Sequence, residues 1–336
     1  MKDYRLPENR REYFSALYRM NLEQGVMPGL VYLYMPALAE RYGWGAEERL
    51  WFAFLNGLTQ NPITSLRMFE RLPAVPPAGA ALTSFTEWFN SEWDTLQFDT
   101  DRRYQKKDTV DAIKSYAALV SDYGSQAAML TNHNYANLWR FVREGYRSFG
   151  RLATFSYLEY VHLNGLGPDC DDLLFEDKSG SRSHRNGMLF LIGKDELVWD
   201  KRLANGQDGS YQNFKPMCEW LAAQSDAYLQ EFESAHPAVP NVGRFTLESN
   251  LCTFKNHFFG RRYPGVYADM AWERILWAEE HGQSACAKIF RRIREERLPE
   301  WLRWECEPKA QSVFSLKWRG AQFPNTGAPF RGEHFL

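Results

Sequence analysis

Apolar residues recur at helical spacing along most of this 336-residue chain, and that pattern constrains its fold more than any other feature. Between Glu8 and Glu23 they fall three and four residues apart, which places them on one face of a helix. Ala46 to Leu58 and Gln212 to Glu233 show the same spacing. Strand patterns, in which apolar and polar residues alternate, are almost absent. We therefore expect an all-α fold.

Two proline-containing stretches punctuate the helical pattern and are typical of connectors. They are LPAVPPAGAA at 72–81 and the segment from Pro237 to Gly243. We expect a main helical domain, possible lobes within it, and a charged helical tail with an irregular C-terminus. The expected bounds are 1–282 for the domain, 1–72 plus 240–282 and 83–236 for the lobes, and 283–336 for the tail.

Charge, aromatic content and cysteine placement narrow the functional classes. A formal net charge of −2 argues against coating nucleic acid by bulk charge, so any DNA contact must use local basic patches. Aromatic residues at 15 % favour a heavily aromatic core. The five cysteines are scattered without a CxxC pair, which argues against a zinc ribbon, an iron–sulfur cluster or a disulfide framework. With no apolar signal region or membrane span, we expect a cytoplasmic protein.

The stretch from Leu251 to Arg274 combines basic and aromatic residues around a break at Gly260 and Pro264-Gly265. Glycine and proline disfavour a helix interior, so the pattern predicts a helix, a short turn and a second helix. Arg261 and Arg262 lie at this turn, where guanidinium groups suit phosphate or carboxylate recognition. The alternative is a solvated basic loop.

A second polar stretch, LNGLTQNPITSL at 55–66, lies beside a very apolar helix. Asn61-Pro62 predicts a helix start, with Asn61 as cap. The amides of Asn56, Gln60 and Asn61 are suited to hydrogen-bond the edge of a base that has been flipped out of DNA. Ordinary capping and turn chemistry is the alternative.

Two features suggest contacts with DNA phosphates. LNGLG at 163–167 has the form of a helix-hairpin-helix turn, whose backbone amides at Gly165 and Gly167 would contact a phosphate. Arg147 and Arg151 continue a basic stripe at helical spacing, for which a solvated face is the alternative.

One histidine has a strongly cationic sequence context. His184 lies between Arg182 and Arg185, and we consider it the best candidate for a general base. The alternative is a Ser/Arg-rich turn whose histidine has no chemical role.

Three long motifs together resemble a known family. WFAFLNGLTQNPITS (51–65), SRSHRNGM (181–188) and CTFKNHFFGRRYPGVYADM (252–270) are similar to the amino acid:DNA transferases of tailed phages, also called α-glutamyl/putrescinyl thymine pyrophosphorylases. The similarity spans roughly Tyr13 to Trp277. That family is thought to be distantly similar to helix-hairpin-helix DNA glycosylases, in agreement with the LNGLG turn.

The resemblance implies a step in thymine hypermodification. A phage kinase would convert 5-hydroxymethyluracil in DNA to its pyrophosphoryl ester inside the infected bacterial cell. The transferase would then replace pyrophosphate with glycine, glutamate, putrescine or a similar amine. The partners implied are DNA containing modified thymine, the small amine and the kinase.

This reaction assigns roles by charge. The site needs cations on the departing phosphates, a base for the incoming ammonium and groups that hold the flipped base. We assign the cations to Arg261, Arg262, Lys255, Arg182 and Arg185, the base to His184 and then Asp269, and base holding to Asn56, Gln60 and Asn61 with Tyr263 or Tyr267 stacking. Asn186 lies in the same motif and is assigned to substrate binding.

The relation to glycosylases leaves alternatives open. Those enzymes carry a catalytic Asp commonly two residues before a histidine, whereas Arg182 stands there before His184 and would stabilise an anionic leaving group. We therefore expect no base excision, but a DNA glycosylase and a non-catalytic DNA-binding module remain the rival hypotheses. Cys252 could add covalently to the uracil ring. A divalent cation could accompany pyrophosphate, although no motif demands one, and we expect no PLP on Lys255.

Overall fold

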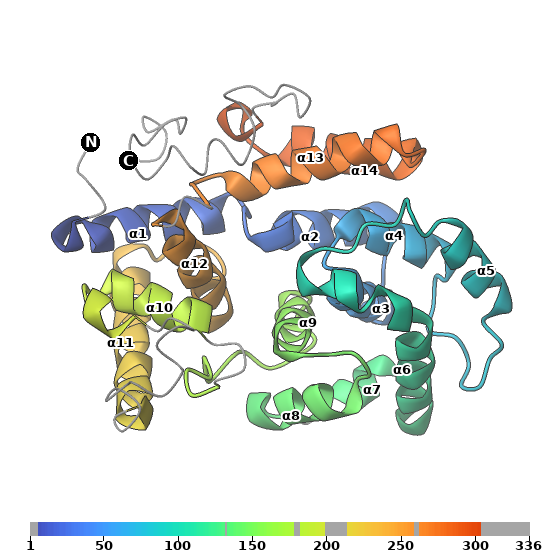
Figure 1. Cartoon of the computed structure of the whole chain (residues 1–336), viewed down its shortest axis with the longest axis horizontal. Helices are drawn as coiled ribbons and strands as arrows, with labels where there is room; N and C mark the ends of the chain where they lie inside the picture. The colour runs from blue at the N-terminus through green and yellow to red at the C-terminus, as the bar shows by residue number, and fades with distance from the viewer. Residues whose placement is uncertain (1–5, 132, 178–181, 199–213, 259–261, 304–336) are drawn as a thin grey trace. The chain divides into compact units, whose positions relative to one another are not determined.

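The structure of the protein is a computed structural model that describes residues 6–131, 133–177, 182–198, 214–258 and 262–303 (Figure 1). Within these residues every regular element is a helix and no strand occurs, so the all-α prediction is confirmed. The helices predicted at Glu8–Glu23 and Ala46–Leu58 are α1 (Pro7–Glu23) and α3 (Ala46–Thr59), each longer by one residue. No helix in the described part of the chain is long and apolar enough to cross a membrane.

The chain forms two compact units, each assembled from separated segments. The described residues of 1–28, 170–270 and 298–336 form the first unit, and those of 29–169 and 271–297 form the second. These units and the predicted lobes group the helices differently, and the predicted lobes stay a prediction.

The first unit contains α1 and the helices that follow residue 170. They are α10 (Arg182–Leu191), η4 (Asp195–Leu197), α11 (Phe214–Ala235), α12 (Arg244–His257) and η6 (Glu300–Leu302). The segments η1 (Pro28–Leu30) and α13 (Val266–Glu280) cross the boundaries between the units.

The second unit contains the helices between residues 31 and 163 and the last α-helix of the described chain. They are α2 (Val31–Tyr42), α3, α4 (Pro62–Arg71), α5 (Thr83–Ser91), η2 (Thr100–Tyr104), η3 (Lys106–Asp108), α6 (Thr109–Tyr123), α7 (Gln126–Leu130), α8 (Tyr135–Gly145), α9 (Arg151–Leu163) and α14 (Ser284–Arg297).

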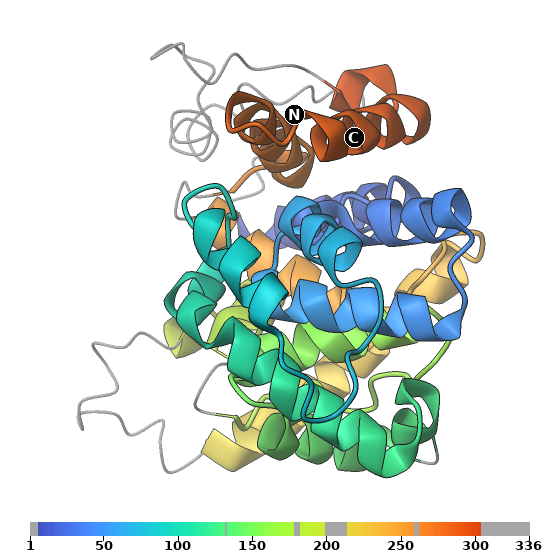
Figure 2. The ribbon, with the colours of Figure 1, turned by 90° about the vertical axis from the view of Figure 1, so that its right-hand side faces the viewer.

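The core of the second unit is built around α3, which is buried along its whole apolar face and packs on α4 and α9. Phe54 stacks on Tyr116 of α6, with ring centroids 3.8 Å apart, and Trp51 lies against the same pair. The charged helix α14, predicted as part of a tail, packs on α2 and α4 (Figure 2). Many aromatic residues of this unit therefore lie in its core, in agreement with the expectation from the aromatic content.

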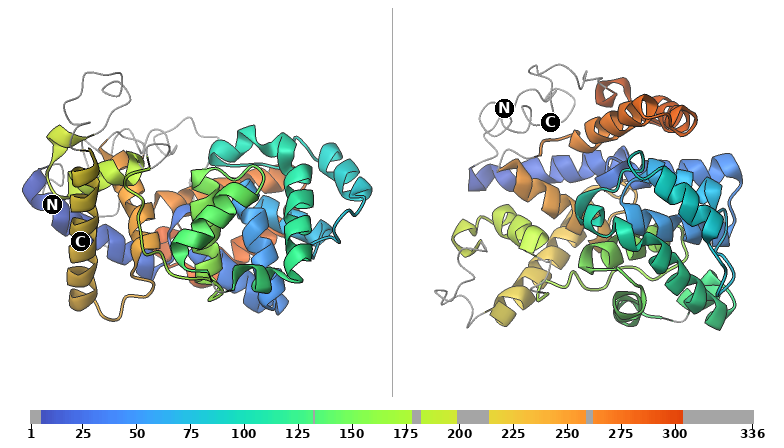
Figure 3. Two further views of the ribbon diagram at one scale, coloured as in Figure 1. Left: turned by 90° about the horizontal axis from the view of Figure 1, so that it is seen from below. Right: turned by 45° about the vertical axis from the view of Figure 1, so that its right-hand side comes forward.

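The first unit is organised around α12, which packs on α1 and α10, while α10 also packs on α11 (Figure 3). Buried polar side chains join α1 to α12. Asn21 Nδ2 donates to Asn250 Oδ1 over 2.6 Å, and the Tyr18 hydroxyl lies 2.8 Å from Thr246 Oγ1. These hydrogen bonds satisfy polar groups that burial would otherwise penalise.

The two helices α10 and α12 cross at Gly187. A Cβ atom at this position would lie 2.2 Å from the carbonyl oxygen of Leu251, so the two backbones touch where a side chain would otherwise stand. Only glycine allows that approach. Position 187 therefore fixes how the two helices face each other.

The predicted helix-turn-helix around residue 260 is confirmed for its two helices, because α12 ends at His257 and α13 begins at Val266. Gly265 has φ +80°, which glycine adopts at no steric cost. Arg261 lies outside the described residues.

The helix crossing yields a stability prediction. We expect Gly187→Ala to destabilise the protein by about 2–3 kcal/mol, because the added methyl group overlaps a backbone carbonyl that cannot move aside. Gly145→Ala is the matched control, since its new Cβ would meet only Leu119 Cδ1, 3.8 Å away. Alanine favours helix there, so the control should be neutral or gain up to about 1 kcal/mol. Denaturant unfolding measures the free energy of unfolding of both variants. Equal changes in the two would contradict the close backbone contact at Gly187.

A second prediction concerns pH. Burial, and then the charge of Arg262, lower the pKa of His257 to about 3 from its ordinary value of 6.5. Below pH 6.5 the unfolded chain binds a proton that the folded protein rejects, so stability falls as pH falls from 6.5 towards 3. His257→Gln removes this titration while keeping a polar partner for the Tyr13 hydroxyl, which lies 3.0 Å from His257 Nδ1. Between pH 7 and pH 5, wild type should lose about 2 kcal/mol more than the variant in urea unfolding. If wild type and His257→Gln lose the same stability between pH 7 and pH 5, the low pKa of His257 is refuted.

Candidate active site

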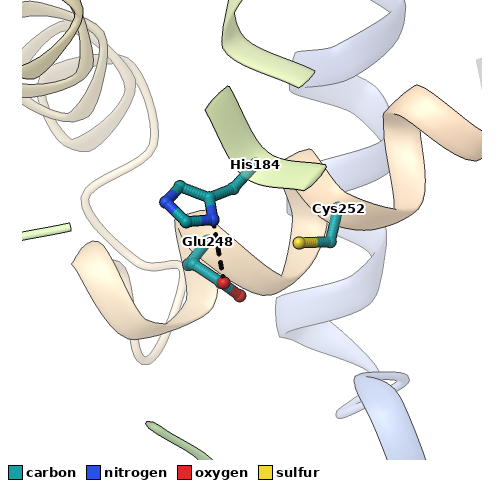
Figure 4. A group of neighbouring side chains, drawn as sticks. All are labelled: His184, Glu248 and Cys252. Atoms are coloured by element: carbon teal, nitrogen blue, oxygen red, sulfur yellow. Dashed lines mark ion pairs between the residues drawn. The ribbon is translucent and has the colours of Figure 1, made fainter. Parts of the chain in front are cut away.

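Four chemically active side chains of the first unit lie where α10 and α12 cross at Gly187. Glu248, Cys252 and Lys255 lie four and three residues apart, so they share one face of α12. His184 lies three residues before Gly187, on the face of α10 that meets them. Figure 4 shows the side chains of His184, Glu248 and Cys252 directed towards one another.

Both nitrogens of His184 have defined neighbours. Nε2 lies 2.9 Å from the carbonyl oxygen of Leu173, and Nδ1 lies 3.0 Å from Glu248 Oε1. A carbonyl oxygen only accepts, so Nε2 carries a proton and Nδ1 is the nitrogen whose protonation can change. The imidazole is fully buried and Glu248 nearly so, while Cys252 is partly exposed.

A nitrogen of His184, a carboxylate oxygen of Glu248 and the sulfur of Cys252 all lie within 4.8 Å of one another. We call this group the His–Glu–Cys cluster. Among the described residues it is the group of side chains suited to hold a metal ion. The same three groups are also suited to accept or donate protons.

Lys255 lies three residues after Cys252, one turn further along α12. Its Nζ donates to Ser183 Oγ over 3.0 Å, which holds the ammonium at the first turn of α10. Arg262 is partly buried, and its charge acts on His257 and on Tyr267. Arg261 and the side chain of Arg182 lie outside the described residues.

Arg185 lies in the interior of the first unit. Its side chain is fully buried; Nη1 donates to the carbonyl oxygen of Phe175 over 2.5 Å, and the guanidinium lies 4.9 Å from the centre of the Phe214 ring. Its contact with pyrophosphate stays a prediction. Asn186, which follows it, is also buried.

Asp269, the second predicted base, lies at the start of α13 in the first unit. The Tyr263 hydroxyl donates to Asp269 Oδ2 over 2.8 Å, and both side chains are buried. The Tyr267 hydroxyl lies 2.7 Å from Thr253 Oγ1; burial raises its pKa, and Arg262 partly opposes that rise. Stacking of a base on Tyr263 or Tyr267 stays a prediction.

The amides proposed to hold a base lie in the second unit. The Asn61 side chain accepts from the backbone N–H groups of Ile63 and Thr64, so its predicted role as helix cap is confirmed. Asn56 is buried and accepts from Ser65 Oγ over 3.1 Å. Gln60 has φ +54°, an uncommon conformation for a residue other than glycine. Base recognition by these amides stays a prediction.

The two glycines of the predicted hairpin have separate reasons to be glycine. Gly165 has φ +70°, and a Cβ at Gly167 would lie 2.6 Å from Val161. The turn follows α9 as expected, but no helix occurs between Leu166 and Asp177, and the next described helix is α10. The helix-hairpin-helix assignment therefore stays a prediction.

The two arginines of the basic stripe before the hairpin differ in exposure. Arg147 is exposed and pairs with Asp111 at 3.1 Å. Arg151 is buried, with its guanidinium 5.8 Å from the Phe155 ring and 5.9 Å from the Trp139 ring. Phosphate contacts by either arginine stay a prediction.

Sequence reasoning gave Glu248 no role, although it faces His184. One signal could have found it. Glu248 is an acidic residue four positions before Cys252 in a helix that is otherwise nearly all apolar or uncharged on its buried side. A carboxylate at such a position needs a partner, which the structure supplies in His184.

Comparisons with known proteins agree with the resemblance in the motifs. A serinyltransferase of Salmonella phage ViI is 25% identical over 303 residues, which cover 86% of this chain and 72% of that protein. No solved structure matches the chain. The family model described as amino acid:DNA transferase matches residues 34–263, which include the whole His–Glu–Cys cluster. Because that match covers more than half of the chain, the protein belongs to the amino acid:DNA transferase family.

Proposed function

We propose that the protein replaces the pyrophosphate of 5-pyrophosphoryloxymethyluracil in DNA with an amine. Its family supports an enzyme of phage DNA modification that transfers an amino acid to DNA, and the rival glycosylase and binding-module hypotheses are not favoured. The leaving group, the modified base and the residue roles are the proposed part.

The reaction exchanges one bond at the exocyclic methylene carbon of the base. The carbon–oxygen bond breaks and its electron pair leaves with pyrophosphate, while the uncharged amine forms the carbon–nitrogen bond. The amine enters as an ammonium and must lose a proton before attack, and the new secondary ammonium loses another. The site therefore needs positive charge beside the departing oxygen and a group that accepts protons.

One observation carries the proposal, namely the convergence of Lys255 and the His–Glu–Cys cluster on the crossing of α10 and α12. Ser183 holds the Lys255 ammonium on the same helix that carries His184, so cation and proton-accepting groups are fixed relative to each other. Arg262, with Arg261, would add charge from the turn after α12. His184 and Asp269 are the candidate proton acceptors.

Selection of the base would use other residues. Asn56, Gln60 and Asn61 are proposed to bind the edge of the flipped base, and Tyr263 or Tyr267 to stack on it. The turn at Gly165 and Gly167 would position a DNA phosphate. These roles follow from residue type and the family resemblance.

The incoming amine is an amino acid or a related small amine. Serine joins glycine, glutamate and putrescine as a candidate because the relative from phage ViI is a serinyltransferase. We propose a 5-hydroxymethyluracil DNA kinase as the supplier of the substrate, the cytoplasm of the infected host as the location, and no requirement for PLP.

Nucleoside mass spectrometry tests the reaction. DNA bearing 5-pyrophosphoryloxymethyluracil is incubated with the protein and each of the four amines, then digested to nucleosides. We expect a thymidine derivative heavier by one amine, with pyrophosphate released in equal amount. Free modified base together with abasic sites would instead establish a glycosylase, and unchanged nucleosides would refute transfer.

A paired substitution tests the cation. Lys255→Ala should lower the transfer rate about a hundredfold because the departing oxygens lose a fixed positive charge. Lys215→Ala is the control, since Lys215 is exposed in the same unit and makes only a loose pair with Glu219 at 3.9 Å. Rates are taken at saturating amine and DNA. If both variants keep the wild-type rate, Lys255 has no part in departure of pyrophosphate.

A further inference from the structure

We propose that His184, Glu248 and Cys252 form a binding site for a divalent transition-metal ion, for which Zn²⁺ is the best chemical fit. The binding site is inferred from geometry within the first unit alone. Its part in catalysis, given below, rests on the proposed function.

The imidazole of His184 is oriented as in a metal site. Histidines that bind metals commonly donate their second ring N–H to a carbonyl or carboxylate, which fixes the tautomer and the ring. The Leu173 carbonyl, 2.9 Å from Nε2, is such an acceptor for His184. The other nitrogen, Nδ1, then points its lone pair into the cluster when the ring is neutral.

The position of Glu248 distinguishes a metal site from a cysteine nucleophile with its base. In a nucleophile–histidine–acid triad the acid binds the ring nitrogen opposite the one that faces the nucleophile. Here Glu248 is 3.0 Å from Nδ1, whereas Nε2 is bound by a backbone carbonyl. In Figure 4 the nitrogen that faces Glu248 is also on the side of the ring towards Cys252. Three donors that gather at one point are the arrangement of a metal site.

The chemistry of the three donor atoms favours Zn²⁺. Imidazole nitrogen, carboxylate oxygen and thiolate sulfur are all ligands of Zn²⁺, while the thiolate disfavours Mg²⁺ and Ca²⁺. Donor atoms within 4.8 Å of one another can reach a common ion at bond lengths of about 2.0–2.3 Å after small side-chain rotations. Three protein ligands among the described residues leave a fourth position of a tetrahedral ion open, as in catalytic zinc sites.

The three ligands are held rigidly, and the site is open to solvent on one side. Glu248 and Cys252 are one turn apart on α12, and Gly187 fixes the approach of α10 that carries His184. Two ligands are buried, which reduces competition from water, whereas Cys252 is partly exposed. A substrate oxygen can therefore reach the ion from the side of Cys252.

In the proposed reaction the open position would accept a pyrophosphate oxygen, and the ion would neutralise the charge that this group gains on departure. The electron pair of the carbon–oxygen bond still leaves with pyrophosphate, and the amine proton still goes to a protein base. His184 would be occupied as a ligand. Asp269 would then be the first candidate for the proton acceptor, in place of His184.

Metal binding is measured on the full chain without DNA. The protein is stripped with a chelator, loaded with Zn²⁺ or Co²⁺, desalted and analysed for metal content. We expect about one equivalent, and the Co²⁺ form should show a thiolate-to-cobalt charge-transfer band that marks the sulfur ligand. Cys252→Ser should abolish that band and weaken Zn²⁺ binding by about tenfold to a hundredfold.

Cys218→Ser is the matched control. Cys218 is a buried thiol of the same unit that hydrogen-bonds the Phe175 carbonyl and lies outside the cluster, so this variant should keep the band. Far-ultraviolet circular dichroism confirms that both variants are folded. Absence of the band in wild type, its persistence in folded Cys252→Ser, or equal loss in Cys218→Ser would overturn the site.

The transfer assay distinguishes failure of the site from failure of the proposed function. If stripped protein is inactive and regains transfer with Zn²⁺, the catalytic role is supported. Full transfer by stripped protein would overturn that role even where Zn²⁺ binds. Absence of product with every metal would instead refute the proposed reaction, while the Co²⁺ spectrum would still decide the binding site.

Discussion

The first unit depends on one steric constraint, the contact between the backbones of α10 and α12 at Gly187. Any Cβ at that position would overlap the Leu251 carbonyl, so the helices cannot approach in this way with another residue. Close approach shortens the gap that side chains must span. It explains how side chains as short as those of His184 and Cys252 meet, and why a reactive group is found at this crossing.

The irregular segment before α10 has a definite physical role. Its backbone carbonyls have no helical partners and serve as acceptors for buried donors, with Leu173 facing His184 and Phe175 facing Arg185. A helix there would have used those carbonyls internally. His184 and Arg185 can be buried because residues 173 and 175 supply carbonyl oxygen atoms to them.

Sequence reasoning recovered what local patterns determine. Helical spacing located the helices, Asn61-Pro62 located a cap, and the motifs indicated the family. It did not find Glu248, because the partnership of α10 with α12 joins residues more than sixty positions apart and no local pattern encodes that pairing. It also did not show that Arg185 is buried, since burial of a guanidinium depends on acceptors, such as the Phe175 carbonyl, that tertiary structure alone provides.

The contacts of α1 have a consequence for how the protein is made. Its side chains hydrogen-bond partners 228 to 244 residues later, through Tyr18 with Thr246, Asn21 with Asn250 and Tyr13 with His257. On the ribosome α1 emerges long before α12, so its apolar face stays uncovered until α12 has been synthesised. The segment 29–169 of the second unit can collapse during that interval. The native contacts of α1 with α12 are therefore among those of highest sequence separation in the first unit, which is the kind of contact that forms late in folding.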